Sequence, residues 1–179
     1  FSPTAGASKI SDAGDFVFRN IENPSAHGNT DSAFFKDKNI NNVAVFIANA
    51  SNAKGYGDAF IYSFEKIGKV VASTTYNQDD SDYRTTIAKV LSSNPQGIYI
   101  GVATGKDAGL LVKQLREQGF SGVILTSTAA DSKEFFDVAG SNSENTYVST
   151  SYFNPLVEPT LTYNNKYKSA YGVDGESFS

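Results

Sequence analysis

Segments that look like buried strands alternate with helical patterns through the middle of the chain, and this alternation limits the fold more than any other feature. The strand-like segments are Val43–Ala48, Lys69–Tyr76, Gly97–Ala103, Gly122–Ser127 and Thr146–Thr150. Unbroken apolar runs such as VAVFIA are typical of parallel strands that are buried on both faces. Five strands with helices between them predict an α/β protein with a doubly wound, mostly parallel sheet of the Rossmann-like or flavodoxin-like type.

The segments between these strands carry apolar side chains at helical spacing. The three stripes are Tyr56, Phe60, Phe64 and Ile67; Tyr83, Ile87, Val90 and Leu91; and Ala108, Leu111, Val112 and Leu115. Gly119 is a plausible stop signal for the third helix. Asp131 and Glu134 resemble a capping box at the start of a short helix through Phe136. A weaker pattern predicts a helix over Asn29–Asp37, before the first strand.

Both ends of the chain depart from this alternation. The first twenty residues are rich in turn-forming types, with one short alternating strand expected over Asp15–Asn20. A polar helix is expected over Leu161–Tyr171, and its few apolar residues predict only light packing. The chain begins at Phe1 and contains no methionine, so we expect a processed or trimmed piece of a longer protein.

Composition excludes several classes of partner. The net charge is −4 and no cluster of Lys or Arg interrupts the sequence, which argues against nucleic acid or an anionic membrane surface. The apolar runs are far shorter than the roughly 20 residues of a membrane-spanning helix. The absence of cysteine excludes disulfides and thiolate metal sites.

Two glycines after the first strand, Gly55 and Gly57, suggest a phosphate-binding turn. A dinucleotide fingerprint requires a third glycine for close helix packing, but Phe60 occupies that position. The second strand ends in Thr74-Thr75-Tyr76, without the acid that would bind a ribose hydroxyl. No Walker A motif or G-x-S-x-G motif is present either. We therefore expect neither a nucleotide cofactor nor an enzyme.

His27 and an acidic turn are the remaining candidates for metal chemistry. His27 is the only histidine, so a zinc site would depend on carboxylates, and a solvated or hydrogen-bonded histidine is the simpler interpretation. The acidic turn contains Asp79, Asp80 and Asp82 but lacks the glycine and glutamate of an EF-hand loop. These acids fit the start of a helix, where negative charge is favourable. No metal is expected.

The order of the segments resembles periplasmic binding proteins of the leucine/isoleucine/valine type. SPTAGASKISDAGDFVFRNI is similar to the turn and strand that close the first half of that family's N-terminal lobe. YNQDDSDYRTTIAKVLSSNPQGIYIG, GKDAGLLVKQLREQGF and SKEFFDVAG resemble successive segments of its second lobe. The resemblance covers nearly the whole chain. It implies that residues 1–20 are a remnant of the first lobe, 21–150 form the second, and 151–179 cross the hinge and start back into the first.

In that family a small solute binds between two lobes, hinge closure buries it, and the closed form is presented to a membrane permease. Alignment without gaps places Asn52 where many members have a tyrosine that touches the ligand. Thr104, with an ambiguity of one residue, falls at an aromatic contact position, and Thr128 falls where amino-acid-binding members use an acid for the ligand's ammonium group. None of the three residues is of the type that the amino-acid-binding pattern has at its position. In particular, Asn52 and Thr128 carry no charge that could offset the desolvation of an ammonium group.

Each of these positions also has a structural interpretation. Asn52 and Thr104 fit turn or helix N-cap positions, and Thr128 fits a turn equally well. Asp131 could replace the missing acid, or it could cap the short helix that follows. The resemblance implies an extracytoplasmic solute-binding protein of a bacterial ABC importer, periplasmic or extracellular, with a small polar solute and a permease as partners. A lipid anchor outside this chain is compatible with that location. The alternative is a ligand-sensing ectodomain of the same fold in a receptor or regulator.

Overall fold

The sheet has five parallel strands in the order β2-β1-β3-β4-β5. The strands are β1 (Asn42–Ala48), β2 (Lys69–Tyr76), β3 (Gly97–Gly101), β4 (Val123–Thr126) and β5 (Thr146–Val148). The computed structural model describes residues 8–14, 16–19 and 21–175 and divides into two units, Phe1–Ser149 and Thr150–Ser179. The first unit contains the sheet. Its strand order is that of a flavodoxin-like doubly wound sheet, so the predicted fold class is confirmed.

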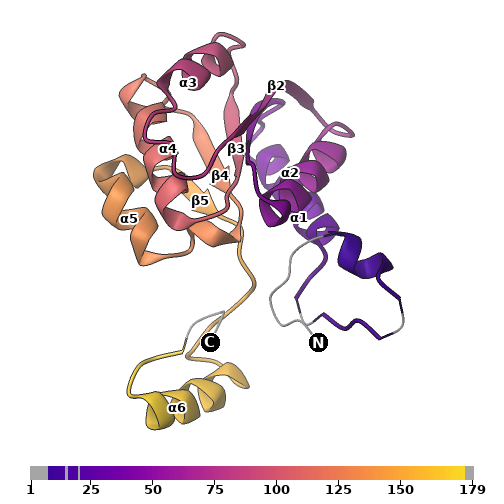
Figure 1. Ribbon diagram of the computed structural model, residues 1–179, viewed down its shortest axis with the longest axis vertical. Helices are drawn as coiled ribbons and strands as arrows, with labels where there is room; N and C mark the ends of the chain where they lie inside the picture. The colour runs from indigo at the N-terminus through magenta and orange to yellow at the C-terminus, as the bar shows by residue number, and fades with distance from the viewer. Residues whose placement is uncertain (1–7, 15, 20, 176–179) are drawn as a thin grey trace. The chain divides into compact units, whose positions relative to one another are not determined.

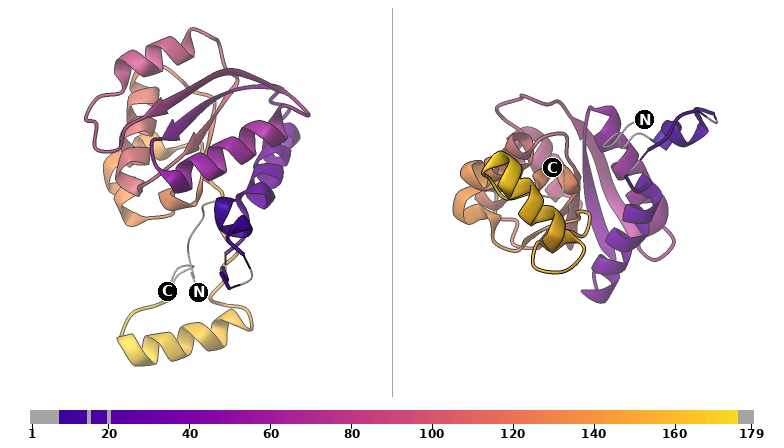
Figure 2. Two further views of the ribbon diagram at one scale, coloured as in Figure 1. Left: turned by 45° about the vertical axis from the view of Figure 1, so that its right-hand side comes forward. Right: turned by 90° about the horizontal axis from the view of Figure 1, so that it is seen from below.

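Helices cover both faces of this sheet (Figures 1 and 2). On one face, α1 (Pro24–Asp37) packs against α2 (Ser51–Phe64). The other face carries α3 (Arg84–Leu91), α4 (Gly105–Glu117) and α5 (Lys133–Ala139). Three short 3-10 helices complete the unit, namely η1 (Ser8–Asp12), η2 (Thr128–Ala130) and η3 (Gly140–Ser143). Because each crossover is right-handed, its helix lies on one face of the sheet when the chain moves one way along the sheet and on the other face when the chain moves the opposite way. The chain changes this direction between β1 and β3, so the helices are divided between the two faces.

Several predicted boundaries move. Helix α1 begins at Pro24, five residues before the predicted start, because the Asn23 side chain accepts a hydrogen bond from the Ser25 amide and proline suits the first helical position. Helix α2 starts at Ser51 and ends at Phe64, so Ile67 lies outside it and is 41% exposed. The third, fourth and fifth strands are each shorter at the carboxyl end than predicted.

The strand predicted over Asp15–Asn20 is wrong for its described part. Residues 16–19 form a turn at Phe16 and a single bridge residue at Arg19, whereas Asp15 and Asn20 lie outside the described residues. The Val17 amide donates to the Gly14 carbonyl at 3.3 Å, and Gly14 has a φ of 94°. This turn bends the chain at the point where the strand was expected.

Close contacts between α2, α1 and the sheet form the centre of the larger unit. The Phe60 ring of α2 stacks on the Tyr99 ring of β3, with centroids 4.0 Å apart and planes 7° from parallel. A Cβ on Gly57 would lie 2.5 Å from the Ile47 side chain, and one on Gly101 would lie 2.9 Å from the Ala53 carbonyl oxygen. Glycine at these two positions therefore lets α2 lie directly on β1 and β3.

The described part of the unit Thr150–Ser179 contains one helix, α6 (Thr160–Tyr171), which confirms the polar helix predicted there. None of the residues of α6 is buried. Tyr163, Tyr167 and Tyr171 follow one another at intervals of four residues, with ring centroids 5.8 and 4.6 Å apart. Gly172, with a φ of 76°, ends the helix in the left-handed conformation that glycine adopts readily.

Gly28 provides a test of this packing, because an added Cβ would lie 2.4 Å from the backbone oxygen of Ala59. We expect Gly28→Ala to lower the free energy of unfolding by about 1–3 kcal/mol, since α1 and α2 must separate and the overpacking outweighs the gain in helix propensity. Urea unfolding followed by circular dichroism measures the change. Ser25→Ala, on the exposed side of α1, is the control and should shift stability by less than about 0.5 kcal/mol. Equal stability of Gly28→Ala and the native chain would contradict the close approach.

Candidate functional site

The carboxyl ends of the strands define the candidate site. In doubly wound sheets, ligands bind outside these ends, at the point where the strand order reverses. Here the reversal lies between β1 and β3, since the chain proceeds from β1 to β2 on one side and from β3 to β4 and β5 on the other. Asn52, Thr104 and Thr128 follow β1, β3 and β4, which are consecutive neighbours in the sheet. The fold therefore brings the three predicted contact residues to one edge.

Asn52 is the second residue of α2 and is half-buried. The residue that precedes the helix, Ala50, provides no side-chain cap, so the first turn lacks the hydrogen bond that a Ser, Asp or Asn would supply. The segment Asn52–Gly55 was expected to form a turn, but it is helical. Within the described residues the Asn52 side chain makes no hydrogen bond. Asn52 therefore does not have the N-cap role that was its alternative interpretation.

Thr104, by contrast, caps a helix. Its hydroxyl oxygen accepts a hydrogen bond from the Asp107 amide at 3.2 Å and donates to Asp107 Oδ2 at 2.8 Å. Its backbone is extended, with φ −138° and ψ 156°, as an N-cap requires. The residue is nevertheless exposed.

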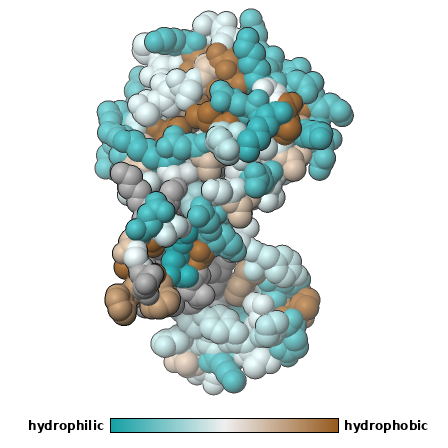
Figure 3. Space-filling model, turned by 90° about the vertical axis from the view of Figure 1, so that its right-hand side faces the viewer, coloured by the Kyte–Doolittle hydropathy of each residue, from teal (hydrophilic) through white to brown (hydrophobic). Residues whose placement is uncertain are grey.

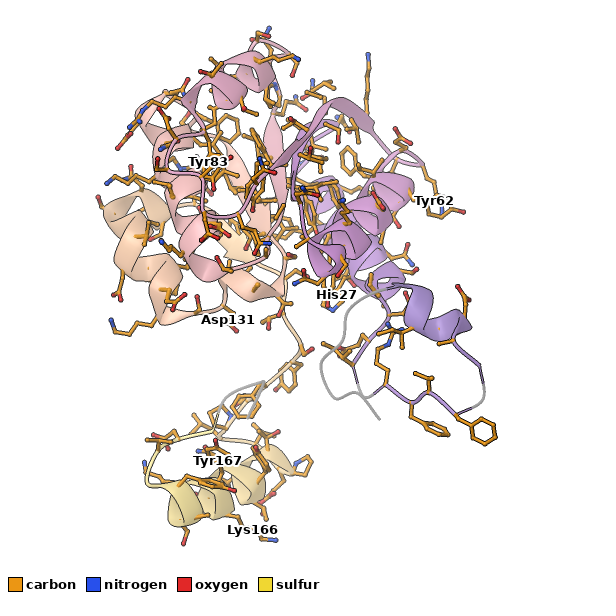
Figure 4. The ribbon with its side chains drawn as sticks, in the orientation of Figure 1. His27, Tyr62, Tyr83, Asp131, Lys166 and Tyr167 are labelled. Carbon is orange, nitrogen blue, oxygen red and sulfur yellow. The ribbon has the colours of Figure 1, made fainter. Side chains whose placement is uncertain are left out.

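Thr128 begins the 3-10 turn η2 after β4 and is half-buried. Its carbonyl accepts a hydrogen bond from the Asp131 amide at 2.9 Å. The capping role predicted for Asp131 is wrong, because the N-cap of α5 is Ser132, whose hydroxyl accepts from the Phe135 amide. Ser132 has the extended backbone of a cap, whereas Asp131 has a ψ of 70°. The Asp131 carboxylate is exposed at the same rim of the unit as His27 (Figure 4).

Cross-links between the loops hold this edge together. Ser127 joins the loops after β3 and β4, because its amide donates to the Ile100 carbonyl at 2.9 Å and its hydroxyl accepts from the Val102 amide at 3.0 Å. Asn49 joins the loops after β1 and β2 through its amide, which donates to the Tyr76 carbonyl at 2.8 Å. Thr104 and Thr128 therefore lie in the loops that Ser127 joins. Asn52 instead follows the loop that Asn49 joins to the end of β2.

The sequence interpretation missed Asp107, which connects two of these loops. Its carboxylate is 3% exposed and accepts hydrogen bonds from the Thr104 hydroxyl and, at 3.3 Å, from the Asp79 amide. The pattern Thr-x-x-Asp over Thr104–Asp107 is a capping-box signal that could have revealed it. Burial, together with the charge of Asp107, raises the pKa of the neighbouring Tyr83 to about 12. Asp107 therefore braces the loops after β2 and β3 through these hydrogen bonds.

The other chemical candidates have structural roles. Gly55 and Gly57 lie inside α2, so they form no phosphate-binding turn. His27 is hydrogen-bonded, as expected, with Nδ1 3.2 Å from Ser149 Oγ, and burial lowers its pKa. Asp82 accepts from the Arg84 amide at the start of α3, as expected for an acid at a helix N-terminus. Residues 8–14, 16–19 and 21–175 contain no cluster of His, Asp and Glu that could hold a metal ion.

Comparison with known proteins decides the family. The family model described as periplasmic binding protein matches residues 1–178. The chain belongs to the periplasmic binding protein family. A sequence relative, the Leu/Ile/Val-binding protein homolog 3 of Brucella melitensis, is 28% identical over 112 residues, which cover 62% of this chain and 29% of that protein.

Solved structures of this family show the same fold. The leucine binding protein LivK from Thermotoga maritima matches with a TM-score of 0.78 and 27% identity, over 89% of this chain and 46% of that one. The branched-chain amino acid transporter substrate binding protein LivJ from Streptococcus pneumoniae, in complex with isoleucine, matches with a TM-score of 0.75 and 21% identity, over 97% of this chain and 50% of that one. A putative branched-chain amino acid ABC transporter from Rhodospirillum rubrum matches with a TM-score of 0.85 and 24% identity, over 99% of this chain and 51% of that one.

This periplasmic binding protein chain therefore spans about half the length of the solved structures it matches. The relatives are named for binding solutes and not for catalysis. In the described part of the chain, no helix has both the length and the apolar character that a membrane span needs. The doubly wound unit supplies one carboxyl edge, with polar residues in the segments that follow three adjacent strands.

The cap at Thr104 yields a prediction about this edge. Thr104→Val keeps the shape of the side chain but removes the cap and a hydrogen-bond donor to the buried Asp107 carboxylate. We expect the free energy of unfolding to fall by about 1–2 kcal/mol. Thr104→Ser retains the hydroxyl and is the matched control, with a change below about 0.5 kcal/mol. Denaturant unfolding of the two variants compares them directly, and equal losses would show that the hydroxyl does not brace the edge.

Proposed function

We propose that this chain forms one lobe of an extracytoplasmic solute-binding protein that serves a bacterial ABC importer and closes around a small polar solute. The solute is an amino acid or a related compound. The observation that carries the proposal is the set of polar side chains on three adjacent strand ends of a periplasmic binding protein sheet. The isoleucine complex of the similar LivJ protein supports an amino acid as the first ligand to test.

Asn52, Thr104 and Thr128 are the proposed contacts with the solute. Asn52 offers both an amide donor and a carbonyl acceptor, and each threonine offers a hydroxyl group. Asn52 is the most informative of the three, because its side chain has no hydrogen bond to another described residue. The uncapped first turn of α2 also leaves backbone N–H groups beside it, which suits an anionic or carbonyl oxygen on the ligand.

Asp131 is the proposed partner of a ligand ammonium group. An ammonium that leaves water requires a compensating negative charge, which neither threonine supplies. Asp131 lies three residues after Thr128, and the capping of α5 by Ser132 leaves its carboxylate unused in the helix. A charge-assisted hydrogen bond to this carboxylate would contribute about 1.5–3 kcal/mol to affinity.

The second half of the site is proposed to lie on another lobe, to which residues 1–20 and 151–179 belong. Apolar side chains in these terminal segments are widely exposed, including Phe16 at 93%, Tyr152 at 84% and Leu156 at 80%. Figure 3 shows that apolar side chains reach the surface outside the sheet-bearing unit as well as on it. Large apolar side chains at the surface commonly mark contacts with another protein surface. Hinge motion between the two lobes would then bury the solute.

The proposed importer role also specifies a partner and a location. A membrane permease would receive the closed form, and the protein would act in the periplasm or at the cell exterior, where a lipid anchor could hold it. Membership of the periplasmic binding protein family supports a location outside the cytoplasm. No feature of the described residues favours the alternative of a sensing ectodomain, so the importer component is the preferred function.

Ligand binding tests the proposal. The two-lobed protein that contains this chain should be screened by thermal shift against leucine, isoleucine, valine, the other amino acids and small polar solutes. A ligand at 100 times its Kd should stabilise the protein by about 2.7 kcal/mol. If no compound in the panel stabilises the ligand-free protein, the proposal is wrong.

The role of Asp131 has a separate test in the same protein. Asp131→Asn should weaken binding of an amino acid by about 10- to 100-fold, as measured by isothermal titration calorimetry, because the ammonium loses its counter-charge. Glu134→Gln is the matched control, since it removes one exposed negative charge from the nearby helix α5. Equal losses for the two variants would indicate only a general electrostatic effect and would rule out a direct contact.

A further inference from the structure

The two outer strands of the sheet differ in length. At one side of the sheet, β5 has three residues, Thr146–Val148. At the other side, β2 has eight residues, Lys69–Tyr76, and in the described part of the chain it pairs with β1 alone (Figure 1). The β2 side therefore presents the longer row of backbone groups that no other described strand uses.

The hydrogen bonds of β2 show which of its backbone groups face outward. The Tyr76 carbonyl accepts from the Asn49 amide at 2.8 Å, so Tyr76 directs its backbone groups toward β1. Because successive residues of a strand alternate in direction, Thr74 also faces β1, whereas Ser73 and Thr75 direct their N–H and C=O groups outward. Both Ser73 and Thr75 are exposed. The Thr75 carbonyl accepts from the Thr74 hydroxyl at 3.4 Å, and one of its lone pairs stays free.

The second part of β2 lacks the features that usually prevent an edge strand from pairing with another chain. Natural edge strands are commonly blocked by a charged side chain, a proline or a bulge. The register of β2 against β1 shifts between Val70 and Ala72, but the pairing from Ala72 to Tyr76 is regular. The sequence of this stretch, ASTTY, contains neither a charge nor a proline. Its threonines favour an extended strand, so it remains available for pairing.

We propose that β2 pairs with β2 of a second copy of this chain, in antiparallel orientation about a two-fold axis at Thr74. In this register, Ser73 of one copy lies opposite Thr75 of the other. Both residues direct their backbone groups outward, so each such pair exchanges its N–H···O=C hydrogen bonds in both directions. Thr74 faces its own counterpart on the axis as a non-hydrogen-bonded pair, with Cα atoms about 4.5 Å apart. The sheets of the two copies are then continuous.

The charges at the two ends of β2 favour a second copy as the partner. Lys66 and Lys69 lie at the start of the strand and outnumber Glu65, whereas Asp79 and Asp80 follow its end. Within the described chain, Lys69, Asp79 and Asp80 form no ion pair. Antiparallel pairing brings the positive start of each strand to the negative end of the other, and the two-fold axis repeats this at both ends. Parallel pairing would instead place like charges together.

The pairing produces a closed and weak dimer. Each copy uses the same strand, so the two-fold contact closes on itself and does not grow into a filament. A stable protein interface buries about 1,200–2,000 Å², and a single pair of short strands contributes less. We therefore expect a reversible dimer with a Kd of about 10–500 μM. The inference goes beyond the proposed function, because none of these contacts uses Asn52, Thr104 or Thr128.

Sedimentation equilibrium of the ligand-free 179-residue chain tests the dimer. We expect the mass to rise from 19.2 kDa toward twice that value between about 10 μM and about 1 mM protein. Thr75→Lys places a charged side chain on the exposed edge of each copy and should raise the Kd at least about tenfold. Ser25→Lys, which makes the same change of charge at an exposed position on α1, is the matched control and should keep the native Kd. Circular dichroism verifies that both variants are folded.

Cross-linking tests the register of the two strands. The chain contains no cysteine, so a single introduced thiol reports on one position. Thr74→Cys places two thiols on the axis at a Cα separation that a disulfide allows. Thr75→Cys is the matched control, because its two copies are diagonal neighbours about 7–8 Å apart, beyond the usual range, although Thr75 is the more exposed residue. Under mild oxidation, Thr74→Cys should form the covalent dimer at least about tenfold faster on a non-reducing gel.

Three results would overturn the proposed dimer. They are a mass of 19.2 kDa at every concentration, an equal effect of Thr75→Lys and Ser25→Lys, and cross-linking of Thr75→Cys as fast as that of Thr74→Cys. Added salt should weaken the native dimer, because it screens the opposite charges at the strand ends, and a Kd that does not change with salt would contradict the charge pairing. No ligand is involved, so failure here is distinct from failure of the proposed solute binding.

Discussion

The close approach of α2 to β1 and β3 is the constraint on which the rest of the larger unit depends. Without side chains at Gly57 and Gly101, the helix backbone lies almost on the sheet, and Phe60 can stack on Tyr99 in the core. The same helix accepts α1 closely at Gly28. This packing positions the start of α2, so it also places Asn52 at the carboxyl edge. That part of the edge lies where the strand order reverses, between β1 and β3.

At that edge, several polar residues have structural roles, and others remain available for the proposed binding. Ser127, Asn49 and Asp107 join neighbouring loops through hydrogen bonds and are used by the fold. Thr104 caps helix α4 and nevertheless remains exposed. A rigid set of loops that still presents a few polar groups is the usual basis of selective binding by small-molecule sites. The geometry therefore agrees with the solute-binding family to which the chain belongs.

Asp31 of α1 shows a different balance, because its carboxyl group is buried. An apolar residue at this position would avoid the desolvation of a carboxyl group, and replacing buried charges with apolar residues often increases stability. The acid is instead retained, and burial raises its pKa to about 6.

The sequence by itself determined the fold class and the identity of most elements. Apolar runs and helical stripes depend on the nearest residues along the chain, and they located all five strands and the helices α2 to α6 to within a few residues. The resemblance that runs through the chain also identified the family, and the three contact candidates do lie at one edge. The strand predicted over Asp15–Asn20 is wrong in its described residues 16–19, because a turn at Gly14 bends the chain there.

Only the tertiary structure decided the roles of individual polar residues. Ser132 and not Asp131 caps α5, because the cap depends on the backbone angles that the preceding turn imposes. Gly57 is required by Ile47 on a neighbouring strand, and Phe60, which excludes a nucleotide fingerprint, is the residue that packs against Tyr99. The contact between His27 and Ser149 joins positions 122 residues apart. Such contacts arise only when distant segments pack together, since no local pattern encodes the distance between two side chains.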